Sequence, residues 1–163
     1  MTQRDKIFEM LRSFDTVMLV TATPDGRIEG RPMQVVDIDD RTGNIWFLTG
    51  RDTRKVHEVG SNAQVALVCQ DERRAYLSIS GVGVVVHEPA RVKEVWREPF
   101  RVWFPDGPDD PEVRLLVVEP LAAEYWDNRG TNKLEYIFEA TRAYVSGERP
   151  RVDEGDQHGR VKL

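Results

Sequence analysis

The chain has 163 residues, of which 40% are hydrophobic and 31% are charged, and its formal net charge is −5. This composition predicts one soluble globular domain and argues against a nucleic-acid surface, because the basic residues are scattered among acidic ones. No apolar run approaches the roughly 20 residues of a membrane span, the N-terminus does not resemble a signal peptide, and the single cysteine, Cys69, interpreted as a buried small hydrophobe, fits a cytoplasmic protein.

The first half of the chain predicts a helix followed by a series of strands. Apolar side chains recur at helical spacing after Thr2, a candidate N-cap. Apolar runs separated by turn residues then predict five strands and one short helix. Gly81 and Gly83 interrupt the last strand, which suggests a bulge or a sharp bend. The expected ranges are 3–14 (helix), 16–23, 27–38 and 44–49 (strands), 53–61 (helix), and 63–70 and 74–86 (strands).

The second half predicts one longer helix, kinked or broken at Pro99, and two strands on either side of Pro120. The polar, aperiodic end of the chain predicts a mobile tail over 148–163, after a folded domain over 1–147. The remaining expected ranges are 88–104 (helix), 103–111 (turn-rich loop), 113–119 and 122–127 (strands), and 134–146 (strand or helix, both open).

The predicted fold is mainly β with short flanking helices. Hairpin-length connections favour a mostly antiparallel sheet, and we expect it to close as a barrel. The alternating β-α-β order of a doubly wound nucleotide-binding fold is missing from the pattern. So are the G-x-G-x-x-G and Walker sequences.

The segment from Arg31 to Lys55 contains the strongest candidate binding site. Three cations and two hydroxyls are expected to converge where a strand leads into the N-terminus of the helix over 53–61. Phosphate binds well at such a place, because free N–H groups and the helix dipole point at it and the cations supply full charges. An aromatic pair on the adjoining strand suggests a flat, phosphorylated cofactor. The converging residues are Arg31, Thr49, Thr53, Arg54 and Lys55, and the aromatic pair is Trp46 and Phe47.

Seven short motifs occur along the chain in an order that resembles one known family. They are D-G (25–26), R-P-M (31–33), W-F-L-T (46–49), T-R-K-V (53–56), S-I-S-G (78–81), W-F-P-D-G-P-D-D-P (103–111) and E-Y-W-D (124–127). Over residues 5–147 the chain resembles the FMN-binding split-barrel superfamily, named for pyridoxamine 5'-phosphate oxidase. Within it, the general stress protein branch is the most similar.

The resemblance implies a split β-barrel homodimer with one FMN in each of two grooves between the subunits. Arg31 and Lys55 would hold the FMN phosphate with help from neighbouring hydroxyls, and Gln34 would line the isoalloxazine edge. Trp126, and with it Trp103, would close the site from the partner subunit. The full implied set of cofactor-binding residues is Arg31, Met33, Gln34, Val35, Leu48, Thr49, Thr53, Arg54, Lys55, Tyr76, Ser78, Trp103 and Trp126.

The chain departs from the oxidases proper after Trp126. There the family pattern has Arg and His residues that hold the substrate phosphate, whereas this chain reads DNRGTNKLEYIFEA, with Arg129 and Lys133 but no His. Pyridoxamine 5'-phosphate oxidation is therefore not expected.

Purely structural interpretations of the same residues stay open. Arg31 alone could be an exposed strand charge, and Arg54 and Lys55 could form a solvated helix face. Trp103 and Trp126 could simply pack in the core. No catalytic triad and no metal-ligand spacing around the histidines is found.

The sequence thus predicts an FMN-binding protein, with FAD as an alternative. The expected activity is a flavin-dependent oxidoreductase of an unidentified small substrate in stress protection, with a nicotinamide as electron donor. The competing hypothesis is a flavin carrier, store or sensor without turnover. A third is a barrel that binds a deazaflavin or pyridoxal phosphate.

Overall fold

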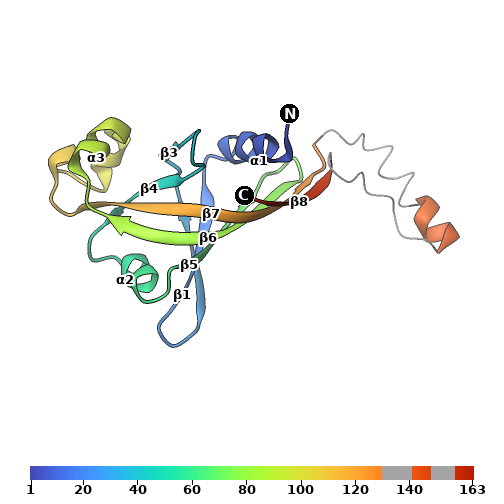
Figure 1. Cartoon of the computed structure of the whole chain (residues 1–163), viewed down its shortest axis with the longest axis horizontal. Helices are drawn as coiled ribbons and strands as arrows, with labels where there is room; N and C mark the ends of the chain where they lie inside the picture. Colours follow the sequence, from blue (N-terminus) through green and yellow to red (C-terminus); the bar gives the residue numbers. More distant parts are fainter. Residues whose placement is uncertain (130–140, 148–156) are drawn as a thin grey trace.

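The computed structural model describes residues 1–129, 141–147 and 157–163, and its centre is an antiparallel sheet crossed by two long strands (Figure 1). The helices are α1 (Gln3–Arg12), α2 (Arg54–Ser61) and α3 (Pro89–Val95), with 3-10 turns η1 (Glu98–Val102) and η2 (Gly107–Asp109). The strands are β1 (Val17–Ala22), β2 (Ile28–Met33), β3 (Asp37–Ile38), β4 (Ile45–Gly50), β5 (Gln64–Gln70), β6 (Ala75–Val86), β7 (Val113–Asp127) and β8 (His158–Lys162). None of the described helices is long and apolar enough to cross a membrane.

The sheet is split rather than closed. Its strand order is β2-β1-β5-β6-β7-β4-β3, with β8 added against β7, so β2 and β3 lie at the two ends of the described ladder. The mainly β fold with short flanking helices is confirmed, whereas the expected closure of the sheet into a barrel is not seen in the described residues. The cause lies in the segment 27–38, predicted as one strand. It divides at 34–36, and its first part pairs with β1 while its second part pairs with β4.

A bulge lets β6 pair along its whole length with β7. The register of β6 against β7 shifts between Ser80 and Gly81, opposite Pro120, which has no N–H to donate. A Cβ at Gly81 would lie 2.4 Å from the carbonyl oxygen of Glu119, so only glycine fits. The predicted bulge is confirmed. The two strands predicted around Pro120 are instead the single strand β7, because the bulge lies at the proline and lets the pairing continue past it.

The main core lies between the inner face of the sheet and α1. Thr2 caps this helix as predicted: its hydroxyl accepts a bond from the Asp5 N–H, and the Asp5 carboxylate accepts one from the Thr2 N–H, a capping box. The buried face of α1 presents Ile7, Phe8, Met10 and Leu11. Cys69, on β5, is buried in the same core, as the sequence suggested.

A second, smaller core forms around α3 at one end of β7. The helix predicted over 88–104 is wrong in extent, because α3 ends at Val95 and the chain is extended at Trp96 before η1 begins. Pro99 explains the break: it cannot donate to the Val95 carbonyl, and its ring would collide with that group. This core contains Val36, Val92, Val95, Phe100, Val113 and Leu115.

The C-terminal segment differs from the predicted mobile tail. Residues 158–162 form β8, antiparallel to β7, and Gly159 packs directly on the ring of Tyr125. Val161 and Leu163 pack against the main core. The alternation of these two apolar residues was too short to be recognised as a strand. Of the segment 134–146, residues 141–146 are helical, and the rest of that prediction lies outside the described residues.

Candidate functional site

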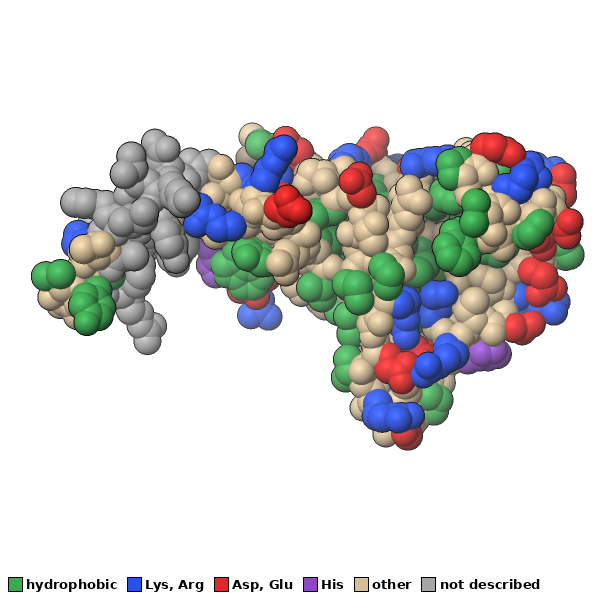
Figure 2. Space-filling model, turned by 180° about the vertical axis from the view of Figure 1, so that it is seen from behind, with side chains coloured by type: hydrophobic (Ala, Val, Ile, Leu, Met, Phe, Trp, Pro, Cys, Tyr) green, Lys and Arg blue, Asp and Glu red, His purple; other side chains and the backbone are tan. Residues whose placement is uncertain are grey.

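A cluster of charged and hydroxyl side chains lies where β2 faces the start of α2. Arg31 projects from the inner face of β2, opposite Leu19 of β1. Its Nη2 lies 2.7 Å from Oε2 of Glu58, and its Nη1 donates to the hydroxyl of Thr21. In Figure 2, basic and acidic side chains lie side by side above the projecting β1–β2 hairpin. Arg31 is thus held in place rather than free on a strand surface.

Glu58 is the residue that sequence reasoning missed. Its side chain is only 5% exposed, and Oε2 also accepts a 2.6 Å hydrogen bond from Thr21. The Thr21 hydrogen bond and then the Arg31 charge hold the pKa of Glu58 below its ordinary value, against the opposing effect of burial. The available signal was helical spacing, because Glu58 sits beside Val59 on the buried face of α2.

Lys55 extends from the first turn of α2 towards two hydroxyls. Its Nζ lies 3.4 Å from Oγ1 of Thr49, which is 3.1 Å from Oγ1 of Thr53. Burial, and then the nearby Arg31 charge, lower the pKa of Lys55, whereas Glu58 raises it. Within the described part of the chain Lys55 has no carboxylate partner in an ion pair. It is therefore a half-buried cation whose charge is available to a ligand.

The N-terminus of α2 is open to an anion. Thr53 is the N-cap, but its hydroxyl bonds Gly50 and Thr49 and does not cap the helix. None of the hydrogen bonds among described residues uses the N–H of Arg54 or Lys55. The first turn contains no acid and begins with two cations, an arrangement that the helix dipole disfavours unless an anion lies nearby. These donors fit a phosphate group.

Arg54 lies at the outer rim of this cluster, with its side chain 74% exposed. It pairs with Glu29 of β2 and lies 3.8 Å from Oε1 of Glu58. The structure therefore brings together all five residues predicted to converge, namely Arg31, Thr49, Thr53, Arg54 and Lys55. Their role in holding a ligand stays a prediction.

The aromatic members of the predicted site lie elsewhere. Arg31 shares the buried inner row of the sheet with Leu19, whereas Tyr76 and Ser78 alternate with buried residues and face outward. Trp126 pairs with Tyr76 and shares the outer face. Trp126 stacks on His158 at a ring distance of 5.3 Å. Within one chain, these side chains cannot meet a ligand at Arg31.

The other predicted residues follow the strands. Met33 and Val35 pack against the main core, and Leu48 packs against the second core. Trp103 is 79% exposed and follows η1. Its neighbour Phe104 lies close to Gly50, because a Cβ there would be 3.9 Å from the Phe104 ring. Trp103 therefore belongs to a segment beside the N-cap of α2.

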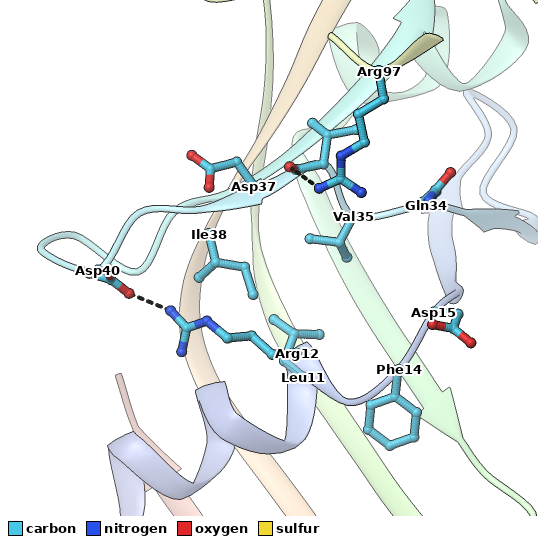
Figure 3. Close-up of a pocket in the computed structure, with 11 residues that line it drawn as sticks. Leu11, Arg12, Phe14, Asp15, Gln34, Val35, Asp37, Ile38, Asp40 and Arg97 are labelled. Atoms are coloured by element: carbon cyan, nitrogen blue, oxygen red, sulfur yellow. Dashed lines mark hydrogen bonds and ion pairs between the residues drawn. The ribbon is translucent and has the colours of Figure 1, made fainter. Parts of the chain in front are cut away.

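A cavity of about 390 Å³ lies between α1 and the segment that joins β2 to β3 (Figure 3). The Arg12–Asp40 ion pair stands on one side, and Arg97 donates to the Val36 carbonyl on the other. None of the converging cations lines it. The lining residues are Leu11, Arg12, Phe14, Asp15, Gln34, Val35, Val36, Asp37, Ile38, Asp40 and Arg97. Only Gln34 and Val35 connect this cavity with the predicted cofactor-binding set.

The segment after Trp126 offers no free cation among its described residues. Arg129 Nε lies 2.8 Å from Oδ1 of Asp127, and this pairing lowers the pKa of Asp127. Lys133 lies outside the described residues. No group of three or more His, Cys, Asp or Glu in the described ranges is arranged to hold a metal ion.

The strand order and the short flanking helices define the split-barrel fold class. The sequence profile described as "Pyridoxamine 5'-phosphate oxidase like" matches residues 2–151, and the chain belongs to this family. No curated protein matches it.

Solved structures show the same fold. The general stress FMN/FAD binding protein from Xanthomonas citri is 29% identical, with 80% of this chain and 92% of that chain covered and a TM-score of 0.68. A candidate general stress protein 26 from Jannaschia is 22% identical over 98% of both chains, with a TM-score of 0.73. A protein from Clostridium acetobutylicum related to general stress protein 26 is 22% identical over 79% of this chain and 92% of that chain, with a TM-score of 0.67.

Proposed function

We propose that this protein binds a flavin nucleotide through its phosphate, at the cluster of Arg31, Lys55 and the N-terminus of α2. The convergence of these donors is the observation that carries the proposal. Lys55 in particular is half-buried and has no carboxylate partner in the described chain. The FMN/FAD binding described for the Xanthomonas citri relative supports a flavin as the ligand.

The site needs two copies of the chain. Trp126 and Tyr76 lie on the outer face of the sheet, opposite Arg31. The same face exposes Met18 and Val68, side by side on β1 and β5. A monomer rarely leaves such apolar surface uncovered. A homodimer would cover it and bring the Trp126 of the partner chain to a flavin held at Arg31.

The proposed activity is a flavin-dependent oxidoreductase acting on a small substrate, with a nicotinamide donor and a role in stress protection in the cytoplasm. When bound, a flavin supplies the electron transfer. The residues of this chain would hold the phosphate, orient the ring along 33–35 and limit water access. Pyridoxamine 5'-phosphate oxidation is not expected, since Arg129 is neutralised by Asp127.

A carrier, store or sensor without turnover is the second candidate. One observation favours it: both carboxylates of the cluster, Glu29 and Glu58, are paired with arginines. No unpaired carboxylate therefore stands beside the proposed phosphate site in the described chain. The test between the two is whether loaded protein oxidises NADH or NADPH faster than free FMN does.

The binding proposal is tested by titrating FMN into the apoprotein and its variants. Lys55→Ala should weaken FMN binding by about 1.5–3 kcal/mol, the range for hydrogen bonds to charged groups. Lys93→Ala is the matched control, because Lys93 pairs with Asp109 at the other core. If wild type, Lys55→Ala and Lys93→Ala bind FMN with equal affinity, the phosphate does not bind at this cluster.

A further inference from the structure

The cluster around Arg31 contains more than cations, and its charge balance is unusual for a phosphate site. Arg31, Arg54 and Lys55 contribute three positive charges, and Glu29 and Glu58 contribute two negative ones. The net charge is therefore only +1. The acids are part of the site, since each accepts a bond from a cation that would otherwise face the ligand.

Several contacts hold the Glu58 carboxylate in place. It is buried beneath Arg31, with Thr21 and Arg31 both donating to Oε2, and Arg54 stands 3.8 Å from Oε1. These bonds keep it ionised, and they fix a negative charge behind the guanidinium. The described bonds of Arg31 use Nη1 and one N–H of Nη2. Nε–H and the second N–H of Nη2 remain for a ligand.

We propose that Glu58 sets the charge preference of this site, by reducing its preference for the doubly charged phosphomonoester of FMN over a singly charged phosphodiester. The inference rests on the flavin-binding function proposed above. A fixed carboxylate repels a dianion about twice as strongly as a monoanion at the same place. With one net positive charge instead of the two it would have without Glu58, the cluster attracts a dianion over a monoanion by a smaller margin. Glu58 is thus a specificity-determining residue that the family resemblance did not indicate.

The surroundings leave room for a diester. Its second ester group must leave the phosphate away from the buried side of the cluster. Arg54, at the rim, is 74% exposed, so the outer side of the phosphate position faces solvent. The simplest flavin diester of this kind is an alkyl ester of FMN. FAD contains a pyrophosphate with one charge on each phosphate, so only its flavin-side phosphate matches a diester.

The test compares four ligands that share one ring: riboflavin, FMN, riboflavin 5'-methylphosphate and FAD. The methyl ester carries one charge and no adenylate, so it separates charge from contacts with the nucleotide. Glu58→Gln is the variant, because the amide oxygen can still accept from Thr21 and Arg31 in the same shape. Glu72→Gln, on an exposed turn, removes one acid without touching the cluster.

Glu58→Gln is expected to tighten FMN binding roughly tenfold and methyl-ester binding roughly threefold, since the released repulsion scales with ligand charge. The ratio of the FMN affinity to the methyl-ester affinity therefore rises in Glu58→Gln, while its riboflavin affinity stays as in wild type. In Glu72→Gln all of these affinities stay as in wild type. The second charge of FAD lies beyond the flavin-side phosphate, so the gain in FAD affinity in Glu58→Gln should fall between the gains of the methyl ester and FMN. A gain outside that range would count against the charge rule.

An unchanged ratio, or weaker FMN binding in Glu58→Gln, would overturn the inference and leave Glu58 as a support for Arg31 only. Circular dichroism checks that the variant is folded. If it is not, Glu29→Gln replaces it as the test variant, because Glu29 is the other acid of the cluster. A smaller shift of the same affinity ratio in the same direction is expected, and no shift would refute the charge rule. If wild-type protein binds riboflavin as tightly as all three phosphorylated ligands, the flavin-phosphate proposal itself fails, which is a distinct result.

Discussion

Replacing Arg31 by alanine tests how the cluster supports the fold. In the described part of the chain, Glu58 is the only charged side chain that is fully buried. Removing one partner of a buried ion pair costs about 3–5 kcal/mol, because the other charge is left without compensation. Here Thr21 still donates to Glu58 at 2.6 Å, and Arg54 remains 3.8 Å away. We therefore expect Arg31→Ala to lower the free energy of unfolding by about 2–4 kcal/mol.

Urea denaturation followed by circular dichroism measures this change. Arg41→Ala, on the exposed turn before β4, is the matched control and should stay within about 0.5 kcal/mol of wild type. The double variant Arg31→Met/Glu58→Leu should recover much of the loss, because it leaves no buried charge. A loss below about 0.5 kcal/mol in Arg31→Ala would show that the buried Glu58 carboxylate does not depend on Arg31. The same coupling makes Lys55 the cleaner probe of ligand binding, since it supports no buried acid.

Three further predictions follow from single residues. The pKa of Glu58 is below its ordinary value of 4.5. The ionised carboxylate therefore contributes to stability above that pH, and this contribution is lost as the pH falls through the lowered native value. Between pH 5 and pH 3, the urea midpoint of Glu58→Gln should fall less than that of wild type. Gly81→Ala should destabilise the protein by more than about 2 kcal/mol, because the added Cβ would lie 2.4 Å from the Glu119 carbonyl oxygen. Gly60→Ala should instead stabilise it by about 0.5–1 kcal/mol, because the space around Gly60 in α2 is open. Burial raises the pKa of Cys69 to about 12, so a thiol reagent should modify Cys69 only at the rate of unfolding, and fast modification of native protein would contradict its position.

Local signals in the sequence were enough to predict most elements. The capping residues around Thr2, the glycines of β6 and the apolar alternation of β1, β4 and β5 each act within a few residues of the chain. The closeness of Thr49, Thr53 and Lys55 could also be anticipated, because β4 leads directly into α2.

Long-range pairing decided what sequence reasoning missed. The division of 27–38 between two edges depends on β1 and β4, not on the segment itself. The strand β8 exists because β7 offers it an edge and Tyr125 accepts Gly159. The sequence around Glu58 is that of an ordinary helix acid, and only the structure shows that Thr21 and Arg31 both donate to its carboxylate.

The most direct test of a flavin-phosphate site is the ratio of two affinities in the wild-type protein. FMN and riboflavin share the ring and ribityl chain and differ only in the phosphate, so their dissociation constants isolate what the cluster of Arg31, Lys55 and α2 contributes. The apoprotein is titrated with each ligand at the same protein concentration, and binding is followed by fluorescence. FMN should bind at least about tenfold more tightly than riboflavin, which corresponds to one charge-assisted hydrogen bond. Equal affinities for FMN and riboflavin would contradict the account.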